Sequence, residues 1–268
     1  MAPDRNELAP LRVFVRIRPG LPREPPLSQP VLLVGAAADG RPSVSVVHAA
    51  SGEAGDGGHR KRITGPTAEV FTFDGVFDPS ASQEEMYKQA AAPQVRACLR
   101  GFNSTVFCYG PSGTGKSFTC YGPEGGQIDA GKVATTRWAT SSAAGIIPRA
   151  AQQLFDAIAS DETLAHGKFL IRVSFLQLYR ENVGDLLSPH AGSLQLREDP
   201  QRGVFVEGIT EVTVRGPSEV WALAARGQRA RATAATRIND VSSRSHAIFT
   251  VVVEQQVRHT PLHLCVYI

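Results

Sequence analysis

The chain has 268 residues, 42% of them hydrophobic, which is enough apolar material for one large globular domain or two small ones. Its formal charge of +3 is too small an excess to identify an acidic partner. No stretch of 18 uncharged apolar residues occurs, and the four cysteines lack CxxC spacing, which argues against a membrane span, a zinc site and a disulfide framework. We therefore expect a soluble intracellular protein with reduced thiols.

The N-terminal third alternates between patterned and unpatterned segments. After an N-terminal extension of residues 1–10, the stretch Leu11–Arg18 alternates apolar and basic residues like a half-buried strand, and Pro19 ends it. Residues 20–68 are rich in Pro, Gly and Ala and could include short edge strands, but we expect a flexible excursion there. Order is predicted to resume at Val70–Phe77.

Helices and strands then interleave. Ser82 and Glu85 form a capping box that predicts a helix toward Arg100. The pattern predicts strands at Thr105–Tyr109, Phe169–Tyr179, Val204–Val214 and Ala247–Gln255, and helices at 146–160 and from Ser218 to about Ala235. We expect a second flexible excursion at 121–144 and a turn-rich stretch between Tyr179 and Pro200. This alternation favours a sheet with helices on both faces.

A phosphate-binding motif, G-x-x-x-x-G-K-[ST], lies between a predicted strand and a predicted helix. Its glycines allow the backbone N–H groups to face a phosphate, Lys116 supplies a positive charge to the β and γ phosphates, and the Ser117 hydroxyl suits magnesium. A glycine-rich turn that matches by chance is the alternative, but the polar lining argues against it. We predict that the loop binds a nucleoside triphosphate through Gly110, Pro111, Ser112, Gly113, Thr114, Gly115, Lys116 and Ser117.

The segment Asn239-Asp-Val-Ser-Ser-Arg-Ser-His246 contains seven polar residues out of eight. Taken alone, it would be interpreted as a solvated loop. In a chain with a phosphate-binding loop, however, its hydroxyls and its arginine fit a sensor of the γ-phosphate, which must reach magnesium and an attacking water.

Six motifs in the same order resemble the motor domain of the kinesin superfamily, over residues 11 to about 255. The motifs are RVFVRIRP, FTFDGVFDPSASQEEMY from Phe71 to Tyr87, VFCYGPSGTGKSFTCYG, GIIPR from Gly145 to Arg149, VSFLQLYRENVGDLL from Val173, and NDVSSRSH, which resembles the family's first switch. The resemblance implies a three-layer α/β P-loop NTPase with a mixed, mainly parallel central sheet flanked by helices. It also implies ATP and Mg²⁺ as cofactors.

The resemblance assigns roles to individual residues. Ser243 would meet magnesium or the γ-phosphate, Ser242 would position the lytic water, and Asn239 would contact the nucleotide. Arg244 would form the ion pair that closes the pocket. Arg16, Arg18 and Pro19 occupy the R-x-R-P positions of the adenine-binding strand, where Pro19 and Tyr87 would flank the adenine. Outward strand charges at the two arginines, and a core position for Tyr87, are the alternatives.

The sequence departs from the family in two places. The strand after the first switch ends in D-x-A-G-S-E in this family, whereas Leu262–Ile268 starts like that strand but has Val266 where the aspartate is expected. Pro111 stands where Gln is common. We therefore interpret residues 11–268 as a motor domain that is incomplete at its C-terminal end, through truncation or alternative splicing. The resemblance leaves open whether these residues alone hydrolyse ATP.

The activity that the resemblance implies is a microtubule-dependent ATPase that couples ATP hydrolysis to movement along microtubules in its complete form. Microtubules are the implied partner, in the cytoplasm, with no nucleic acid or membrane partner, and homo-oligomers would form through segments outside this sequence. The alternative is a nucleotide-binding but non-motile fragment or regulatory isoform. An unrelated P-loop kinase would need acceptor-site residues, which we do not find.

Overall fold

The structure is a computed structural model that describes residues 11–22, 24, 31–48, 67–123, 141–160, 169–189, 192–200, 203–237, 245–255 and 262–267. The chain falls into two compact units, residues 1–81 and 82–268. The predicted extension, residues 1–10, lies outside the described residues. The predicted domain boundaries stay a prediction, and each unit is described by itself below.

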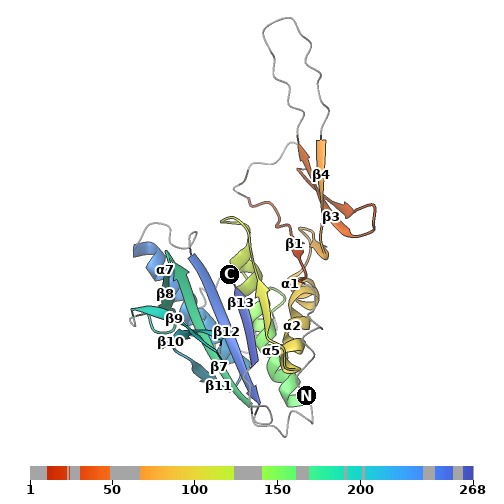
Figure 1. The fold of residues 1–268 in the computed structure, drawn as a ribbon. Coiled ribbons are helices and arrows are strands. Elements are labelled where there is room, and N and C mark those ends of the chain that lie inside the picture. The colour runs from red at the N-terminus through yellow and green to blue at the C-terminus, as the bar shows by residue number, and fades with distance from the viewer. Residues whose placement is uncertain are drawn as a thin grey trace, which may run out of the picture. The chain divides into compact units, whose positions relative to one another are not determined.

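The first unit contains two small sheets (Figure 1). Strands β1 (Phe14–Arg16) and β5 (Gly75–Phe77) are parallel, and strands β2 (Leu32–Ala36), β3 (Pro42–His48) and β4 (Thr67–Thr72) form an antiparallel sheet. Strand β1 is shorter than the predicted Leu11–Arg18. Strands β2 and β3 correct the expected flexible excursion at 20–68, because alternating Val and Ser residues in β3 suit a half-buried strand. Residues 49–66 lie outside the described part.

The second unit begins with a helical segment that contains one π-helical turn. Its parts are α1 (Gln83–Met86), the π-helix η1 (Tyr87–Ala91) and α2 (Ala92–Leu99). As predicted, Ser82 caps the start: its Oγ accepts a hydrogen bond of 3.1 Å from the Glu85 N–H. Pro93 explains the wide turn, because proline lacks an N–H and its ring would clash with the carbonyl four residues earlier.

The main sheet of the second unit is mixed, but its described pairs are mainly antiparallel. It consists of β6 (Ser104–Phe107), β7 (Phe169–Tyr179), β8 (Asn182–Asp185), β9 (Ser193–Asp199), β10 (Gly203–Glu207), β11 (Val212–Val214), β12 (Ser245–Gln255) and β13 (Leu262–Tyr267). The order is β10-β9-β8-β7-β12-β13-β6, with β11 also on β7. Among these described pairs only β13 and β6 are parallel, so the predicted mainly parallel sheet is wrong.

Short turns produce this antiparallel pattern. Tyr179 pairs with Asn182, so β7 and β8 are joined by a two-residue turn whose residues, Arg180 and Glu181, have φ of 47° and 65°. Such turns join antiparallel neighbours, whereas parallel strands need a long crossover. Strands β8 and β9 lie in the stretch before Pro200 that the sequence predicted only as turn-rich. The predicted strand Val204–Val214 is two strands, β10 and β11, separated at Gly208, where φ is 74°.

Three further helices complete the described elements: α3 (Lys116–Tyr121), α5 (Ile146–Ser160) and α7 (Pro217–Arg237). The predicted helix 146–160 is confirmed. Ser218 does not cap α7, because the helix begins at Pro217, a favoured first residue, and the Gly216 carbonyl accepts from the N–H of Glu219 at 3.2 Å. No described helix is long and apolar enough to cross a membrane.

The core of the second unit lies between one face of the main sheet and the helices that pack on that face. Strands β7 and β12 lie side by side (Figure 1), with Phe175 paired to Phe249 and Val173 to Val251. The two phenyl rings meet edge to face at 5.2 Å. Leu154 of α5 and Gly227 of α7 pack on this face, and α5 also contacts α2 and α3. The described helices thus form one layer against the sheet.

Candidate functional site

The glycine-rich loop, residues 110–117, connects β6 to α3. Gly110, Gly113 and Gly115 have φ of 150°, 80° and 96°, values that side chains rarely allow. At Gly110 there is a second reason for glycine, because a Cβ would lie 2.8 Å from the Thr114 Oγ1. These φ values let the backbone curl at the three glycines, and Gly115 places Lys116 at the first turn of α3.

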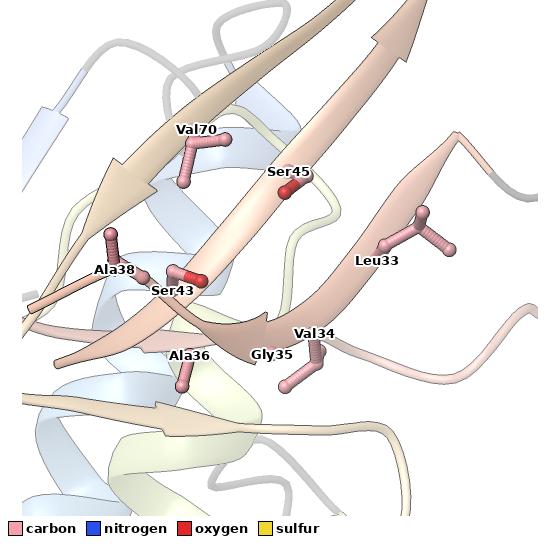
Figure 2. Close-up of a pocket in the computed structure, with 9 residues that line it drawn as sticks. Leu33, Val34, Gly35, Ala36, Ala38, Ser43, Ser45 and Val70 are labelled. Atoms are coloured by element: carbon pink, nitrogen blue, oxygen red, sulfur yellow. The ribbon is translucent and has the colours of Figure 1, made fainter. Parts of the chain in front are cut away.

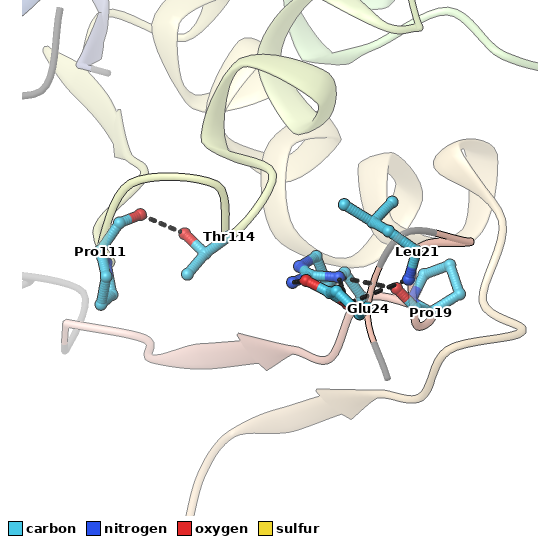
Figure 3. A network of polar contacts seen from close by, with 6 residues as sticks. Pro19, Leu21, Glu24, Pro111 and Thr114 are labelled. Atoms are coloured by element: carbon cyan, nitrogen blue, oxygen red, sulfur yellow. Dashed lines mark hydrogen bonds and ion pairs between the residues drawn. The ribbon is translucent and has the colours of Figure 1, made fainter. Parts of the chain in front are cut away.

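Lys116 holds the two ends of the loop together. Its ammonium Nζ donates to the carbonyls of Gly110 and Pro111, at 2.7 and 2.8 Å. The Pro111 carbonyl also accepts from the Thr114 hydroxyl at 2.8 Å, a contact that Figure 3 shows. An ammonium has three donors, so one remains for a ligand oxygen beside the loop.

The loop also offers backbone donors. In the described part of the chain, the N–H groups of Ser112, Gly113 and Gly115 have no hydrogen-bond acceptor. Ser112 and Ser117 are exposed, so their hydroxyls can face a ligand in water. A set of N–H donors around one ammonium is the arrangement that binds phosphate groups.

Helix α3 is held in place by residues from two neighbouring segments. The Gln83 side-chain amide donates hydrogen bonds to the Phe118 carbonyl at 2.6 Å and to the Ala143 carbonyl at 3.4 Å. Gly145 lies so close to α3 that a Cβ there would be 2.5 Å from the Cys120 carbonyl carbon. These contacts give a physical reason for a glutamine and a glycine in two of the quoted motifs, to which sequence reasoning assigned no role.

The proposed adenine-side residues of the first unit are partly engaged with each other (Figure 3). Arg18 forms an ion pair with Glu24 and donates a hydrogen bond of 3.0 Å to the Pro19 carbonyl. The hydrogen bond to Glu24 raises the pKa of Arg18 above its ordinary value. Arg16 is the last residue of β1 and is half-buried. Their roles toward a nucleotide stay predictions.

Tyr87 lies in the interior of the second unit. Only 6% of the residue is exposed, and its hydroxyl donates to the Gln153 Oε1 at 2.5 Å. Burial raises the pKa of the Tyr87 phenol well above its ordinary value. These observations favour the alternative of a core residue, and contact with adenine stays a prediction.

The four switch residues, Asn239, Ser242, Ser243 and Arg244, lie outside the described residues. Their C-terminal flank is described: Arg231 of α7, with 8% of the residue exposed, donates to the Ser245 carbonyl at 2.9 Å and to its hydroxyl at 3.2 Å. Burial lowers the pKa of Arg231. Sequence reasoning missed this anchor, since one arginine in an Ala- and Arg-rich helix carries no signal of its own.

An open depression of about 410 Å³ lies on the three-stranded sheet of the first unit (Figure 2). It is lined by small and apolar residues with two serine hydroxyls: Leu33, Val34, Gly35, Ala36, Ala37, Ala38, Ser43, Ser45 and Val70. No charged side chain and no predicted site residue lines it, so it offers nothing that would hold a triphosphate.

The chain is similar to known proteins both in sequence and in fold. A model of the kinesin motor domain matches residues 35–264. The kinesin-like protein KIN-12A of Arabidopsis thaliana is 35% identical over 273 residues, covering 96% of this chain and 20% of that protein. The kinesin heavy chain of Neurospora crassa is 39% identical over 186 residues, covering 69% of this chain and 18% of that protein. The chain therefore spans about a fifth of these curated relatives.

A solved structure described as a fast kinesin superposes on the chain with a TM-score of 0.73 at 31% identity. The match covers 96% of this chain and 64% of that one. The fold of this chain is that of a P-loop NTPase with a mixed sheet and helices, as the sequence predicted. Since the family model covers most of the sequence and the fold agrees with a solved kinesin, this chain belongs to the kinesin motor domain family.

Proposed function

We propose that the loop from Gly110 to Ser117 binds the phosphates of ATP together with a magnesium ion. In the complete protein, hydrolysis of this ATP would drive movement along microtubules. The observation that supports the proposal most is the geometry of the loop. Three of its glycines have positive φ, and several of its N–H groups have no hydrogen-bond acceptor among the described residues. The Lys116 ammonium donates to the carbonyls of Gly110 and Pro111.

Each loop residue has a part in this proposal. The third donor of Lys116 would reach the β and γ phosphates, and the N–H groups of Gly113 and Gly115 would surround the β phosphate. Magnesium prefers oxygen ligands, and the exposed Ser117 hydroxyl fits that requirement, with Ser243 as the second proposed hydroxyl. Bound magnesium would neutralise the charge that develops on the phosphates.

The first switch would complete the chemistry. Ser242 would position the lytic water, Asn239 would contact the nucleotide, and Arg244 would close the pocket through an ion pair. Arg231 supports this assignment, because its hydrogen bonds to Ser245 fix the residue that directly follows Arg244. A switch whose end is fixed can change conformation over a short segment and pass that change to β12.

The test is the affinity for a fluorescent ATP analogue in the presence of magnesium, measured for the wild type and for Lys116→Ala. Removal of the ammonium should weaken binding by about ten- to a hundredfold, because charge-assisted hydrogen bonds to phosphate are lost. Lys88→Ala is the matched control, since Lys88 is exposed and pairs with Glu84 four residues away. A chelator of magnesium should also weaken binding in the wild type.

Equal affinity of the wild type and Lys116→Ala, with unchanged thermal unfolding, would remove the basis of the proposal. The microtubule part is tested separately with the full-length protein. ATP turnover should rise when microtubules are added, and Arg244→Ala should abolish the rise. Turnover that does not respond to microtubules would leave ATP binding intact and would contradict the motor function.

A further inference from the structure

Two cysteine side chains, one before and one after the phosphate-binding loop in the sequence, are in contact. Cys108 follows β6 and precedes Gly110 by two residues, and Cys120 lies in α3, three residues after Ser117. The Cys120 thiol donates to the Cys108 sulfur, and the two sulfur atoms are 3.4 Å apart. All of residues 110–117 therefore lie between two thiols that are already in contact.

The two thiols differ in access to solvent. Cys120 is fully buried, and Cys108 is half-buried. The hydrogen bond to Cys108 and burial together raise the pKa of Cys120 well above its ordinary value. Cys108 is consequently the sulfur that a small oxidant in solution reaches first, and Cys120 is the resolving thiol behind it.

We propose that Cys108 and Cys120 form a reversible disulfide when the protein meets a peroxide, and that this bond restricts the phosphate-binding loop. The Cys108 sulfur attacks one peroxide oxygen, the O–O bond breaks, and sulfenic acid and water form. The Cys120 sulfur then attacks the Cys108 sulfur, the S–O bond breaks, and a second water leaves. Two thiols are oxidised to one disulfide while one hydrogen peroxide is reduced to two waters.

The bond would change the shape of the loop because of the distance involved. Disulfide sulfurs are about 2.05 Å apart, so the present 3.4 Å must shorten by more than 1 Å. That movement draws the end of β6 and the first turns of α3 together. Gly110 follows the end of β6 by three residues and Ser117 lies in α3, so the donors that face a phosphate would be displaced. This part rests on the proposed function of the loop.

The first measurement maps the bond. The reduced 268-residue chain is treated with hydrogen peroxide, the remaining thiols are alkylated, and peptides are analysed by mass spectrometry without reduction. We expect a linked peptide pair containing Cys108 and Cys120, two hydrogens lighter than the reduced pair, that a dithiol separates. Cys98→Ala, which removes another buried thiol, should still form it, and Cys108→Ser should not.

The second measurement compares affinity for a fluorescent ATP analogue before and after oxidation. Affinity should fall about tenfold, the equivalent of one charged hydrogen bond, and recover with the dithiol. Cys120→Ala, which keeps the buried volume small and apolar, cannot form the link, so its affinity should not show the tenfold fall and the recovery with the dithiol. Oxidation of Cys108 without a link to Cys120, or a link to a different cysteine, would overturn the proposal.

The two parts fail separately. If the disulfide forms and affinity is unchanged, control of the loop is refuted. If the reduced protein binds no nucleotide, the proposed function of the loop fails, while the peptide mapping still decides whether the thiols couple.

Discussion

The three-stranded sheet of the first unit and the β7–β12 pair of the second unit use the same apolar residue types in opposite ways. Leu33, Val34 and Val70 of the first unit are 48%, 47% and 56% exposed, whereas Val173 and Phe249 are 0% and 1% exposed. The difference is the layer of helices, since α5 and α7 cover β7 and β12. A valine-rich strand stabilises a fold only where another element removes it from water.

The largest expected effect compares leucines in the two regions. Leu154→Ala leaves a cavity at a fully buried position in α5 and should lower the free energy of unfolding by about 2–5 kcal/mol. Leu33→Ala, at an exposed position, should change it by less than about 0.5 kcal/mol. Urea unfolding followed by circular dichroism measures both. Similar losses for the two variants would mean that the sheet of the first unit is covered in solution.

The next comparison adds one methyl group to each region. Gly227→Ala puts a Cβ 2.1 Å from the Phe175 ring, so overpacking should cost about 1–3 kcal/mol despite the better helix propensity of alanine. In β2, Gly35→Ala meets only the Ser43 hydroxyl at 4.0 Å and should be tolerated. Phe175→Leu added to Gly227→Ala should recover part of the loss. A double variant less stable than Gly227→Ala would show that the clash is not the cause.

The smallest expected effect compares polar contacts. Tyr87→Phe removes a hydrogen bond to Gln153 in the interior and should cost about 0.5–1.5 kcal/mol. The ion pair of Asp39 and Arg41 in the first unit is exposed, so Asp39→Asn should leave the unfolding midpoint unchanged.

The pH dependence of the free energy of unfolding tests the same tyrosine. The folded protein keeps the Tyr87 proton at pH values where the unfolded chain has lost it, because burial raises the pKa. The unfolded state then binds fewer protons, so stability should fall as pH rises above about 10, the ordinary tyrosine pKa. Tyr87→Phe should show a shallower fall. An identical slope in the two proteins would indicate that this phenol titrates normally.

Long periodic segments were predictable from the sequence, and so was the phosphate-binding motif. Both the helix at 146–160 and strand β7 have the predicted bounds, because 11 to 15 residues of regular pattern outweigh local turn preferences. The loop could be located because its three glycines have positive φ angles that other residues rarely adopt.

Features that depend on distant partners could not be predicted. Arg180 and Glu181 form a hairpin turn without the Asn-Gly signal such turns usually carry, so β8 was not expected. The roles of Gln83 and Arg231 depend on the carbonyls of Phe118 and Ser245, which only the folded chain brings near. Whether neighbouring strands are parallel or antiparallel likewise depends on the length of the connections between them. Composition identifies those connections only as turns and does not show which strands they join.

Strand β6, which leads into the phosphate-binding loop, pairs within the described residues only with β13, where Ser104 lies opposite Leu264, 160 positions later in the sequence. Closing so long a loop has a high entropic cost, and contacts of large sequence separation slow folding. During synthesis on a ribosome, β6 leaves the exit tunnel long before its partner strand has been translated. Until β13 emerges, the backbone edge of β6 that β13 will occupy is open to pairing with strands of other chains, which makes the nascent protein prone to aggregation in this interval.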